Sequence, residues 1–392
     1  MTPLGHDYAG FAGLIAGLLG LAIAFAATAA GLHLRAARAE RRRAARWARW
    51  EPGLLDALVG AGDAAAFAAT VTRPERADAL ALLVAYALRL GGESLATLAV
   101  AAAPLLPDGR AALRSPRADR RAASVRLLGL LGAETDRPAL ADALRDPVPA
   151  VAMAAARALA RTQDARFVGP VVGALGRFEP WGTNAVASML ALYGLAAGPA
   201  LAQTFADTGA CGSVRVVCAE ALRRLGFFPA APAAARIAAA MPPAMPPATS
   251  PATLAAGPAA SVELCTASLR LLRDVGGPAE AWAVRPLLSS PHAAVRLHAV
   301  STLAAISQDP ADAARIEHAL GDASAWVAQR AARGLIESGR AAHLHALAAG
   351  DAPRNRAARQ ALAEAGLAPA DRAPDAAADR APAAAPEPVP LR

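Results

Sequence analysis

The stretch VRLHAVSTLAAIS, residues 295–307, decides the fold because similar stretches recur along the chain. Val295, Ala299 and Leu303 are spaced by four residues, which places all three on one face of an α-helix. Similar patterns stand at 124–132 (SVRLLGLLG), 214–226 (VRVVCAEALRRLG) and 327–339 (VAQRAARGLIESG). This repetition predicts stacked helical units that share a continuous core.

Alignment of the repeats on one leucine gives a series at spacings of 31, 31, 32, 47, 34, 32 and 27 residues, namely Leu128, Leu159, Leu190, Leu222, Leu269, Leu303, Leu335 and Leu362. The interval of 47 is one unit plus an insertion. Four residues after five of these leucines stands a glycine, where a left-handed helix cap favours it: Gly132, Gly194, Gly226, Gly339 and Gly366. Each unit is therefore predicted as two helices, the second of which buries the leucine.

The same register predicts helix caps and one further unit. Asp146, Ser290 and Asp322 precede second helices and are predicted to cap them. A degenerate earlier unit is expected at 79–92, with Leu88 in the leucine position and Gly92 after it.

The composition excludes several other classes of protein. Of 392 residues, 55% are apolar but only 4% are aromatic, which argues against a β-sandwich or barrel and favours an all-α chain. Three cysteines, at 211, 218 and 265, lack the number and spacing of a disulfide framework or a zinc site.

An apolar run near the N-terminus is long enough to cross a bilayer. No formally charged residue lies between Asp7 and Arg35, and residues 9–34 exceed the roughly 20 apolar residues that a span needs. A cleaved secretory signal is the competing interpretation, but the run is long for a signal core and no arginine precedes it. We therefore expect a transmembrane helix over 9–34.

A basic segment, 35–51, follows the apolar run and predicts the orientation of this helix. Its seven arginines face one acid, Glu40, and by the positive-inside rule they stay in the cytoplasm: Arg35, Arg38, Arg41, Arg42, Arg43, Arg46 and Arg49. Contact with anionic lipid headgroups is their expected role rather than a specific ligand site. Trp47 and Trp50 are candidates for an aromatic anchor at the interface or for part of an interfacial helix.

The charge of the remaining chain argues against nucleic-acid binding. The net charge is +8, with 40 basic and 32 acidic residues, and all the bases are arginine. With the seven arginines and Glu40 set aside, the other residues carry only +2. A nucleic-acid-binding domain would have a basic surface of its own, so no nucleic-acid partner is expected.

Composition divides the rest of the chain. We expect a short extracytoplasmic N-terminus at 1–8, degenerate helical repeats at 52–109 and the repeat solenoid at 110–366. Prolines predict a projecting loop at 241–258, with a polyproline ligand as the alternative to a plain spacer. The Pro/Ala-rich tail at 367–392 has no apolar periodicity and is expected to be disordered.

No arrangement of residues in the sequence predicts catalysis. Nucleotide-binding, hydrolase and metalloprotease motifs are absent from it, so we expect no catalytic residues, cofactor, metal site or small-molecule substrate. His343 and His345 are close in sequence, but at this spacing they point to different sides of a helix. Cys218 occupies a buried alanine position and is expected to be a structural thiol.

One set of arginines is a candidate for partner binding. Arg126, Arg157 and Arg333 each stand two residues before the aligned leucine. Equivalent positions in stacked repeats line one face, so these side chains either line a binding groove or form an ordinary solvated face.

The repeats resemble the HEAT-like family, in particular the short type first noted in phycocyanobilin lyases. The stretches that carry the resemblance to its D-P-x-x-x-V-R-x-x-A-x-x-A-L-x-x-L-G pattern are 290–306, 212–226 and 146–160. The resemblance implies a right-handed α-solenoid whose concave surface binds proteins. The family's arginine after the valine, which commonly bonds between neighbouring repeats, is replaced by Ala152 and Ala328, so weaker junctions are expected there.

Together these features predict a single-pass protein of a bacterial inner membrane, with its N-terminus outside and a cytoplasmic HEAT-like solenoid. We expect a non-catalytic scaffold that binds a membrane-associated protein. The alternative is an accessory subunit of a membrane enzyme, such as a polysaccharide-synthesising glycosyltransferase, or of a transporter. A bilin-lyase-like activity is the third hypothesis. It ranks last because the repeats by themselves are a scaffold and carry no activity.

Overall fold

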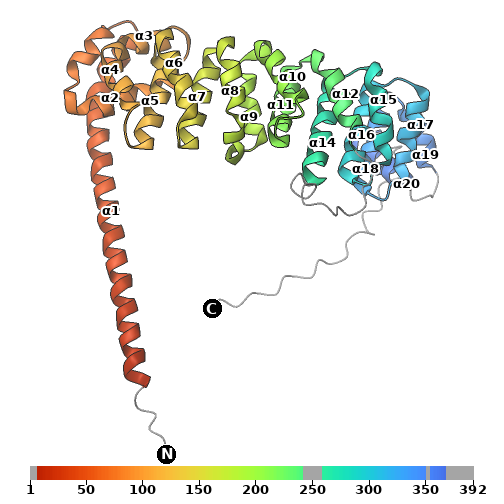
Figure 1. Cartoon of the computed structure of the whole chain (residues 1–392), viewed down its shortest axis with the longest axis horizontal. Coiled ribbons are helices and arrows are strands. Elements are labelled where there is room, and N and C mark those ends of the chain that lie inside the picture. Colours follow the sequence, from red (N-terminus) through yellow and green to blue (C-terminus); the bar gives the residue numbers. More distant parts are fainter. Residues whose placement is uncertain (1–6, 242–257, 350–353, 368–392) are drawn as a thin grey trace, which may run out of the picture. The chain divides into compact units, whose positions relative to one another are not determined.

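The computed structural model describes residues 7–241, 258–349 and 354–367, which are helical with short turns and include no β-strand (Figure 1). The chain divides into two compact units, Met1–Leu159 and Ala160–Arg392. Most of the expected N-terminal segment (1–8), proline-rich loop (241–258) and C-terminal tail (367–392) lies outside the described residues.

Unit 1 begins with a single long helix, α1 (Asp7–Leu58). The predicted span at 9–34 and the basic segment at 35–51 thus belong to one helix. Its other helices are α2 (Arg76–Ala87), α3 (Gly92–Ala102), α4 (Leu106–Ala112), α5 (Ala118–Leu131), α6 (Arg137–Asp142) and α7 (Pro149–Thr162), the last ending just inside unit 2.

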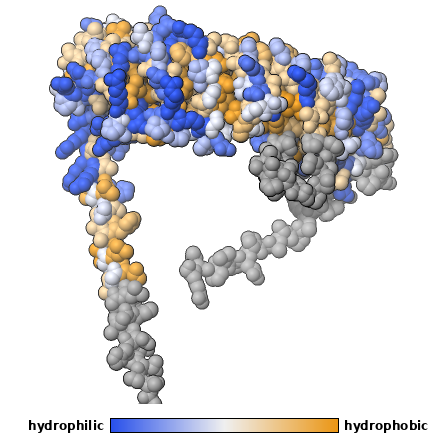
Figure 2. Space-filling model, viewed as in Figure 1, coloured by the Kyte–Doolittle hydropathy of each residue, from blue (hydrophilic) through white to orange (hydrophobic). Residues whose placement is uncertain are grey.

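The two ends of α1 have opposite environments. The large apolar side chains between Leu18 and Leu34 are exposed, from 57% for Leu34 to 76% for Phe25. Near the other end Trp50 and Leu54 are buried, and this part of α1 contacts α2 and α3. Figure 2 shows the apolar part of α1 standing clear of the compact part of unit 1.

Among the described residues α1 is the one unbroken helix that is long and apolar enough to cross a membrane. The segments Thr183–Ala191 and Gly194–Ala206 reach the same apolar content together, but they are bent by 114°. They bury Leu190 and Leu201 in unit 2, as core helices of a soluble domain do.

Unit 2 is a stack of helix pairs. The second helices of successive pairs pack side by side, in the order α9 (Thr183–Ala191), α11 (Gly212–Leu225), α14 (Pro258–Val275), α16 (Ala293–Ile306), α18 (Ala325–Glu337) and α20 (Arg354–Glu364). The first helices pack against them in a second layer: α8 (Val168–Gly173), α10 (Gly198–Ala206), α12 (Ala231–Ala239), α15 (Ala281–Val284), α17 (Pro310–His318) and α19 (Ala341–Ala348). This is a two-layer stack of helical repeats, as the sequence predicts.

The leucine register confirms the repeat alignment. All eight aligned leucines are buried, with at most 3% of each exposed. The residues one turn earlier are buried as well, as at Ala299 of α16. Two turns earlier Val295 is buried, whereas Val214 of α11 is half-buried. A helix of a two-layer stack must bury one stripe, and this spacing supplies it.

The register expected for the degenerate unit at 79–92 is wrong. Leu88 is 60% exposed, while Leu83 and Ala87 on α2 are fully buried. In this unit α2 packs against α5 and α1, and that packing turns its apolar stripe by one position relative to the later repeats. The buried stripe of α2 therefore does not follow the leucine register of the later repeats.

Four of the five predicted glycine caps have the left-handed backbone that a cap requires. Gly194, Gly226, Gly339 and Gly366 have φ between 61° and 78°. Gly132 differs, because its φ of −73° and ψ of 160° are extended. Its N–H bonds to the Leu128 carbonyl, and a Cβ would lie 2.3 Å from that oxygen, so close approach rather than backbone conformation favours glycine there.

Candidate interaction surface

Arginine–aspartate pairs connect neighbouring repeats at their second helices. In unit 2, Arg296 donates from Nε and Nη2 to both carboxylate oxygens of Asp322, at 2.7 and 2.9 Å. In unit 1, Arg121 binds Asp146 with the same two atoms at 2.7 and 2.9 Å. Both arginines also donate from Nη1 to the two carbonyls at the start of their own helix. These pairs fix the spacing between repeats.

The aspartates of these pairs bond within the turns before the second helices and are not the helix caps that the sequence predicts. The N-cap residues of α16 and α18 are His292 and Ser324, two positions after Ser290 and Asp322. Asp146 accepts the backbone N–H of Val148 at 2.9 Å, and Asp322 accepts that of Ser324 at 2.8 Å. The bond to Arg296 is the main reason that the pKa of the Asp322 carboxyl lies below its usual value.

A second set of pairs connects first helices to the following repeat. Arg110 binds Asp136 at 2.6 Å, and Arg285 binds the fully buried Asp312 at 2.8 Å from two nitrogens. Asp312 also accepts from the Ser307 hydroxyl at 2.6 Å. Each buried carboxylate thus has the hydrogen bonds that burial of a charge requires.

Ala152 and Ala328 stand where the family pattern has arginine, and both are buried. Neither can form the Arg–Asp link, so the weaker junctions expected there remain a prediction. Arg215, at the same position in α11, donates to the Phe205 carbonyl of its own repeat at 2.9 Å. The link is therefore present at two second-helix junctions of the described chain.

The three arginines proposed as a binding stripe have different surroundings. Arg126 and Arg157 are exposed on α5 and α7 of unit 1, with no ion pair among the described residues. Arg333, on α18 of unit 2, is half-exposed and pairs with Glu364 at 2.5 Å. Unit 1 thus holds two members and unit 2 the third.

The second helices of unit 2 carry a network of polar side chains from α9 to α14. Arg224 of α11 donates to Asn184 on α9 at 3.2 Å and to Glu220 on its own helix at 3.1 Å. Arg223 binds the same Glu220 and also Asp274 of α14, each at 2.7 Å. Polar contacts therefore bridge three consecutive repeats on this face.

Further along the same layer, arginines outnumber acids. Arg270 and Arg273 lie on α14, and Arg330 on α18 pairs with Glu337 at 3.2 Å. His298 lies on α16 between them. Burial, and then the positive charges of Arg270, Arg273 and Arg330, lower the pKa of His298 to about 4, so this ring is neutral at neutral pH.

Apart from Arg333, the sequence analysis did not single out the residues of this cluster. Arg270 with Arg273 and Arg330 with Arg333 are two pairs at i, i+3 spacing, which places each pair on one side of its helix. They come together because α16 packs against both α14 and α18. The spacing is a signal in the sequence, but only the packing order gives it meaning.

Three of the seven arginines assigned to the membrane flank contact unit 1 itself. Arg43 and Arg46 pair with Asp78, and Arg49 pairs with Glu75 at 2.8 Å. The expected interfacial tryptophans also pack here, since Trp50 is buried and Trp47 donates from Nε1 to the Asp78 carbonyl at 3.2 Å.

The other four arginines, Arg35, Arg38, Arg41 and Arg42, are exposed and have no ion pair in the described chain. Four rather than seven arginines of the basic segment are therefore free of ion pairs within the described chain.

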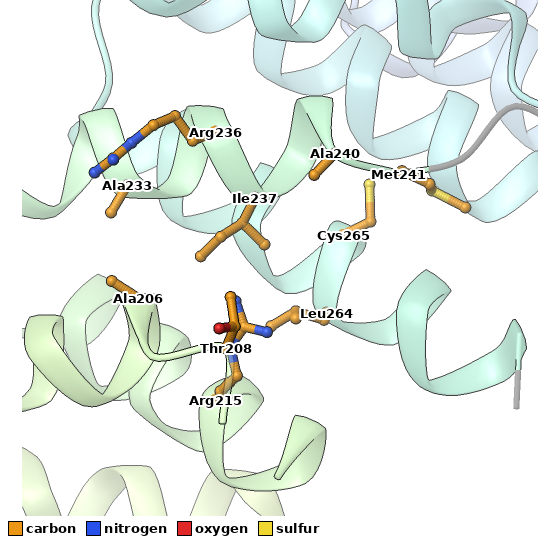
Figure 3. A pocket seen from close by; sticks show the side chains of 10 residues that line it. All are labelled: Ala206, Thr208, Arg215, Ala233, Arg236, Ile237, Ala240, Met241, Leu264 and Cys265. Atoms are coloured by element: carbon orange, nitrogen blue, oxygen red, sulfur yellow. The ribbon is translucent and has the colours of Figure 1, made fainter. Parts of the chain in front are cut away.

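Two open grooves lie between repeats of unit 2. One, of about 390 Å³, is lined by Ile237 of α12 and by Leu264 and Cys265 of α14, with Arg215 and Arg236 also in its wall (Figure 3). The other, of about 610 Å³, lies between α8 and α10. The ten lining residues of the first groove include no carboxylate or histidine, so they hold no acid–base pair.

Histidines and cysteines form no cluster of three or more potential metal ligands among the described residues. His343 contacts Glu317 at 2.8 Å on the surface. Cys218 is buried, as expected, and burial raises the pKa of its thiol to about 12. Cys265 is buried as well, whereas Cys211 is exposed.

No protein-family model and no curated protein matches the sequence. Solved structures with similar folds include a mutant of Kap121p, at 13% identity and a TM-score of 0.45, where the match covers 76% of this chain and 38% of that one. The karyopherin Kap121p bound to the extreme C-terminus of the protein phosphatase Cdc14p matches at 13% identity, with a TM-score of 0.37 and coverages of 75% and 42%. An engineered protein matches at 17% identity, with a TM-score of 0.32 and coverages of 73% and 83%. This chain spans about two fifths of Kap121p, and likenesses this distant assign it neither a family nor a partner.

Proposed function

We propose that this protein is a non-catalytic, membrane-anchored scaffold whose helical repeats bind another protein at the bacterial inner membrane. One observation carries the proposal: apolar side chains of α1 from Leu18 to Leu34 are exposed, while Trp50 and Leu54 build the other end of the helix into unit 1. An exposed apolar helix of this length is costly in water and is stabilised by lipid.

The contacts between the end of α1 and the other helices of unit 1 would hold those helices at a defined distance from the membrane. Sixteen residues separate Leu34 from Trp50, which is about 24 Å along an α-helix at 1.5 Å per residue. Arg46 and Arg49 then pair with acids at 75 and 78, and these contacts hold the end of the helix in one orientation. A fixed stalk would present the repeats to a partner that lies at the membrane.

The cytoplasmic orientation of the repeats is part of the proposal. Arg35, Arg38, Arg41 and Arg42 remain available for the cytoplasmic leaflet, and four positive charges beside a span are enough to favour this orientation. A reporter that works only in the cytoplasm should be active when fused after residue 366. Activity of a periplasm-dependent reporter at the same position would reject the orientation.

The second-helix layer supports protein binding. It presents side chains from consecutive repeats on one face, as in repeat proteins generally, and we further propose the right-handed superhelix that HEAT-like repeats form. We also propose that the units are short HEAT-like repeats of the lyase type, on the basis of the sequence pattern. In unit 1, the exposed arginines Arg126 and Arg157 are separate candidates for contact with the partner.

Crosslinking in native membranes, followed by mass spectrometry, tests the proposal. We expect one protein to be captured in stoichiometric amount, and its identity would separate a general scaffold from an accessory subunit of a membrane enzyme or transporter. The triple variant Arg126→Glu, Arg157→Glu, Arg333→Glu should lose this partner while its helical circular dichroism is unchanged. Failure to capture any protein with the full chain would reject a binding function.

A further inference from the structure

Four arginines gather on the second-helix layer of unit 2, and we name them the basic face: Arg270, Arg273, Arg330 and Arg333. The first two lie on α14 and the others on α18, and α16 packs between the two helices. Neighbouring packed helices lie about 8–10 Å apart, so α14 and α18 are separated by roughly 16–20 Å.

The positive charge of the basic face is only partly balanced. Glu337 pairs with Arg330 and Glu364 with Arg333, whereas Arg270 and Arg273 have no ion pair among the described residues. The acid next to Arg273, Asp274, already binds Arg223 of α11. Two net positive charges therefore remain on this face.

The surroundings of Arg330 indicate that the excess positive charge lowers the stability of the free protein. Its side chain is only 17% exposed, and burial, opposed by Glu337 but reinforced by Arg273, lowers the pKa of its guanidinium. His298 lies in the same cluster in its neutral form. A partly buried cation beside other cations destabilises the free protein, and a bound anion would remove that penalty.

Carboxylates fit this face better than a nucleic-acid backbone does. Arginine binds a carboxylate through two parallel hydrogen bonds, and the two free arginines offer such forks on α14. Glu337, Glu364 and Asp274 interrupt the positive surface. A phosphate chain with a charge on every nucleotide would meet these acids, whereas a peptide can place neutral residues opposite them.

We infer that the basic face binds an extended acidic segment of the protein partner, with two groups of carboxylates placed to reach α14 and α18. At about 3.3 Å per residue, a separation of 16–20 Å corresponds to five or six residues of extended chain. The inference rests on the proposed scaffold function and specifies the chemistry of the segment that is recognised.

Fluorescence anisotropy with the full chain in phosphatidylcholine nanodiscs tests this inference. The probe is a fluorescein-labelled peptide with two Glu-Glu pairs separated by four Gly/Ser residues. We expect the peptide to bind, and the variant Arg270→Gln/Arg273→Gln should raise its Kd by about tenfold or more. These two side chains make no ion pair and add to the positive charge around Arg330, so the protein should stay folded with its thermal stability unchanged or slightly raised.

The control variant is Arg117→Gln/Arg120→Gln, which removes two exposed arginines of unit 1 and should leave the Kd unchanged. Arg270→Lys/Arg273→Lys keeps the charge but loses the planar fork, and it should bind with intermediate affinity. A peptide with glutamine in place of glutamate should not bind.

Three results would overturn the inference: no binding of the acidic peptide, equal affinity for wild type and Arg270→Gln/Arg273→Gln, or tighter binding of a 12-nucleotide oligothymidine that displaces the peptide. Crosslinking in membranes separates this failure from failure of the scaffold function. If Arg270→Gln/Arg273→Gln still captures the wild-type partner, the scaffold function stands and the basic face is not its site. If no protein is captured at all, the scaffold function fails, whatever the peptide does.

Discussion

Arg296 binds Asp322 through two parallel hydrogen bonds, at 2.7 and 2.9 Å, across the junction between two repeats. The guanidinium is 17% exposed and the carboxylate 11%, so the pair is largely removed from water. The same geometry joins Arg121 to Asp146 in unit 1. Arg296 and Asp322 are each also bonded to the backbone of the turn before their own helix. The pair therefore fixes the orientation of one helix pair relative to the next.

Arg296→Ala should lower the free energy of unfolding by about 3 kcal/mol, because it leaves a nearly buried carboxylate without its counterion. Urea unfolding followed by circular dichroism measures this change. Arg315→Ala is the matched control: Arg315 is 47% exposed and Asp312 keeps its bonds to Arg285, so the cost should stay below about 1 kcal/mol. In a double-mutant cycle, Asp322→Ala should cost much less once Arg296 is absent, and additive costs would contradict the coupling.

The leucine register predicts a large contrast between two positions. Leu303→Ala should destabilise unit 2 by about 2–5 kcal/mol, since it opens a cavity at a fully buried site. Leu88→Ala, at a position that is 60% exposed, should change stability by no more than about 0.5 kcal/mol. Similar unfolding midpoints for the two variants would show that the register drawn from the repeats is misplaced.

Glycine caps give a test that depends on backbone conformation alone. Gly226 has a φ of 61° and open space around its Cβ position, so Gly226→Ala should cost about 1 kcal/mol through strain in the left-handed cap. Gly173 also has open space but lies in α8 without a positive φ, so Gly173→Ala should be neutral or stabilise by up to about 1 kcal/mol. Opposite signs in thermal unfolding are the expected result, and a stabilising Gly226→Ala would contradict the cap.

His298 should make stability depend on pH. Its pKa is lowered from 6.5 to about 4 by burial and by Arg270, Arg273 and Arg330, so the unfolded chain binds a proton that the folded chain does not. The resulting stabilisation is present above pH 6.5 and is lost as the pH falls toward 4. With allowance for partial exposure, the loss should be up to about 2 kcal/mol.

His298→Gln removes this contribution without changing the neighbouring carboxylates, which titrate in the same range. The difference in unfolding free energy between wild type and His298→Gln should therefore shrink or reverse between pH 7 and pH 4.5. A difference that does not change with pH would mean that the histidine has the same pKa in the folded and the unfolded chain.

The local pattern of the sequence determined much of this architecture. Helices, their ends and the buried leucines depend on spacings within one unit of about 31 residues, and these can be read along the chain because each repeat packs mainly on its neighbours. The apolar run at 9–34 likewise indicates an apolar helix long enough to cross a bilayer through length and composition alone.

Tertiary structure decided the features that depend on which helix packs against which, and in what rotation. Trp50 and Arg46 follow an apolar span in the sequence, yet they are turned into unit 1, where α2 packs against α1 and places Asp78 beside Arg46. The turn after α5 makes Gly132 extended rather than left-handed. The basic face joins residues about 60 positions apart, and no local spacing specifies that α14 and α18 flank the same helix.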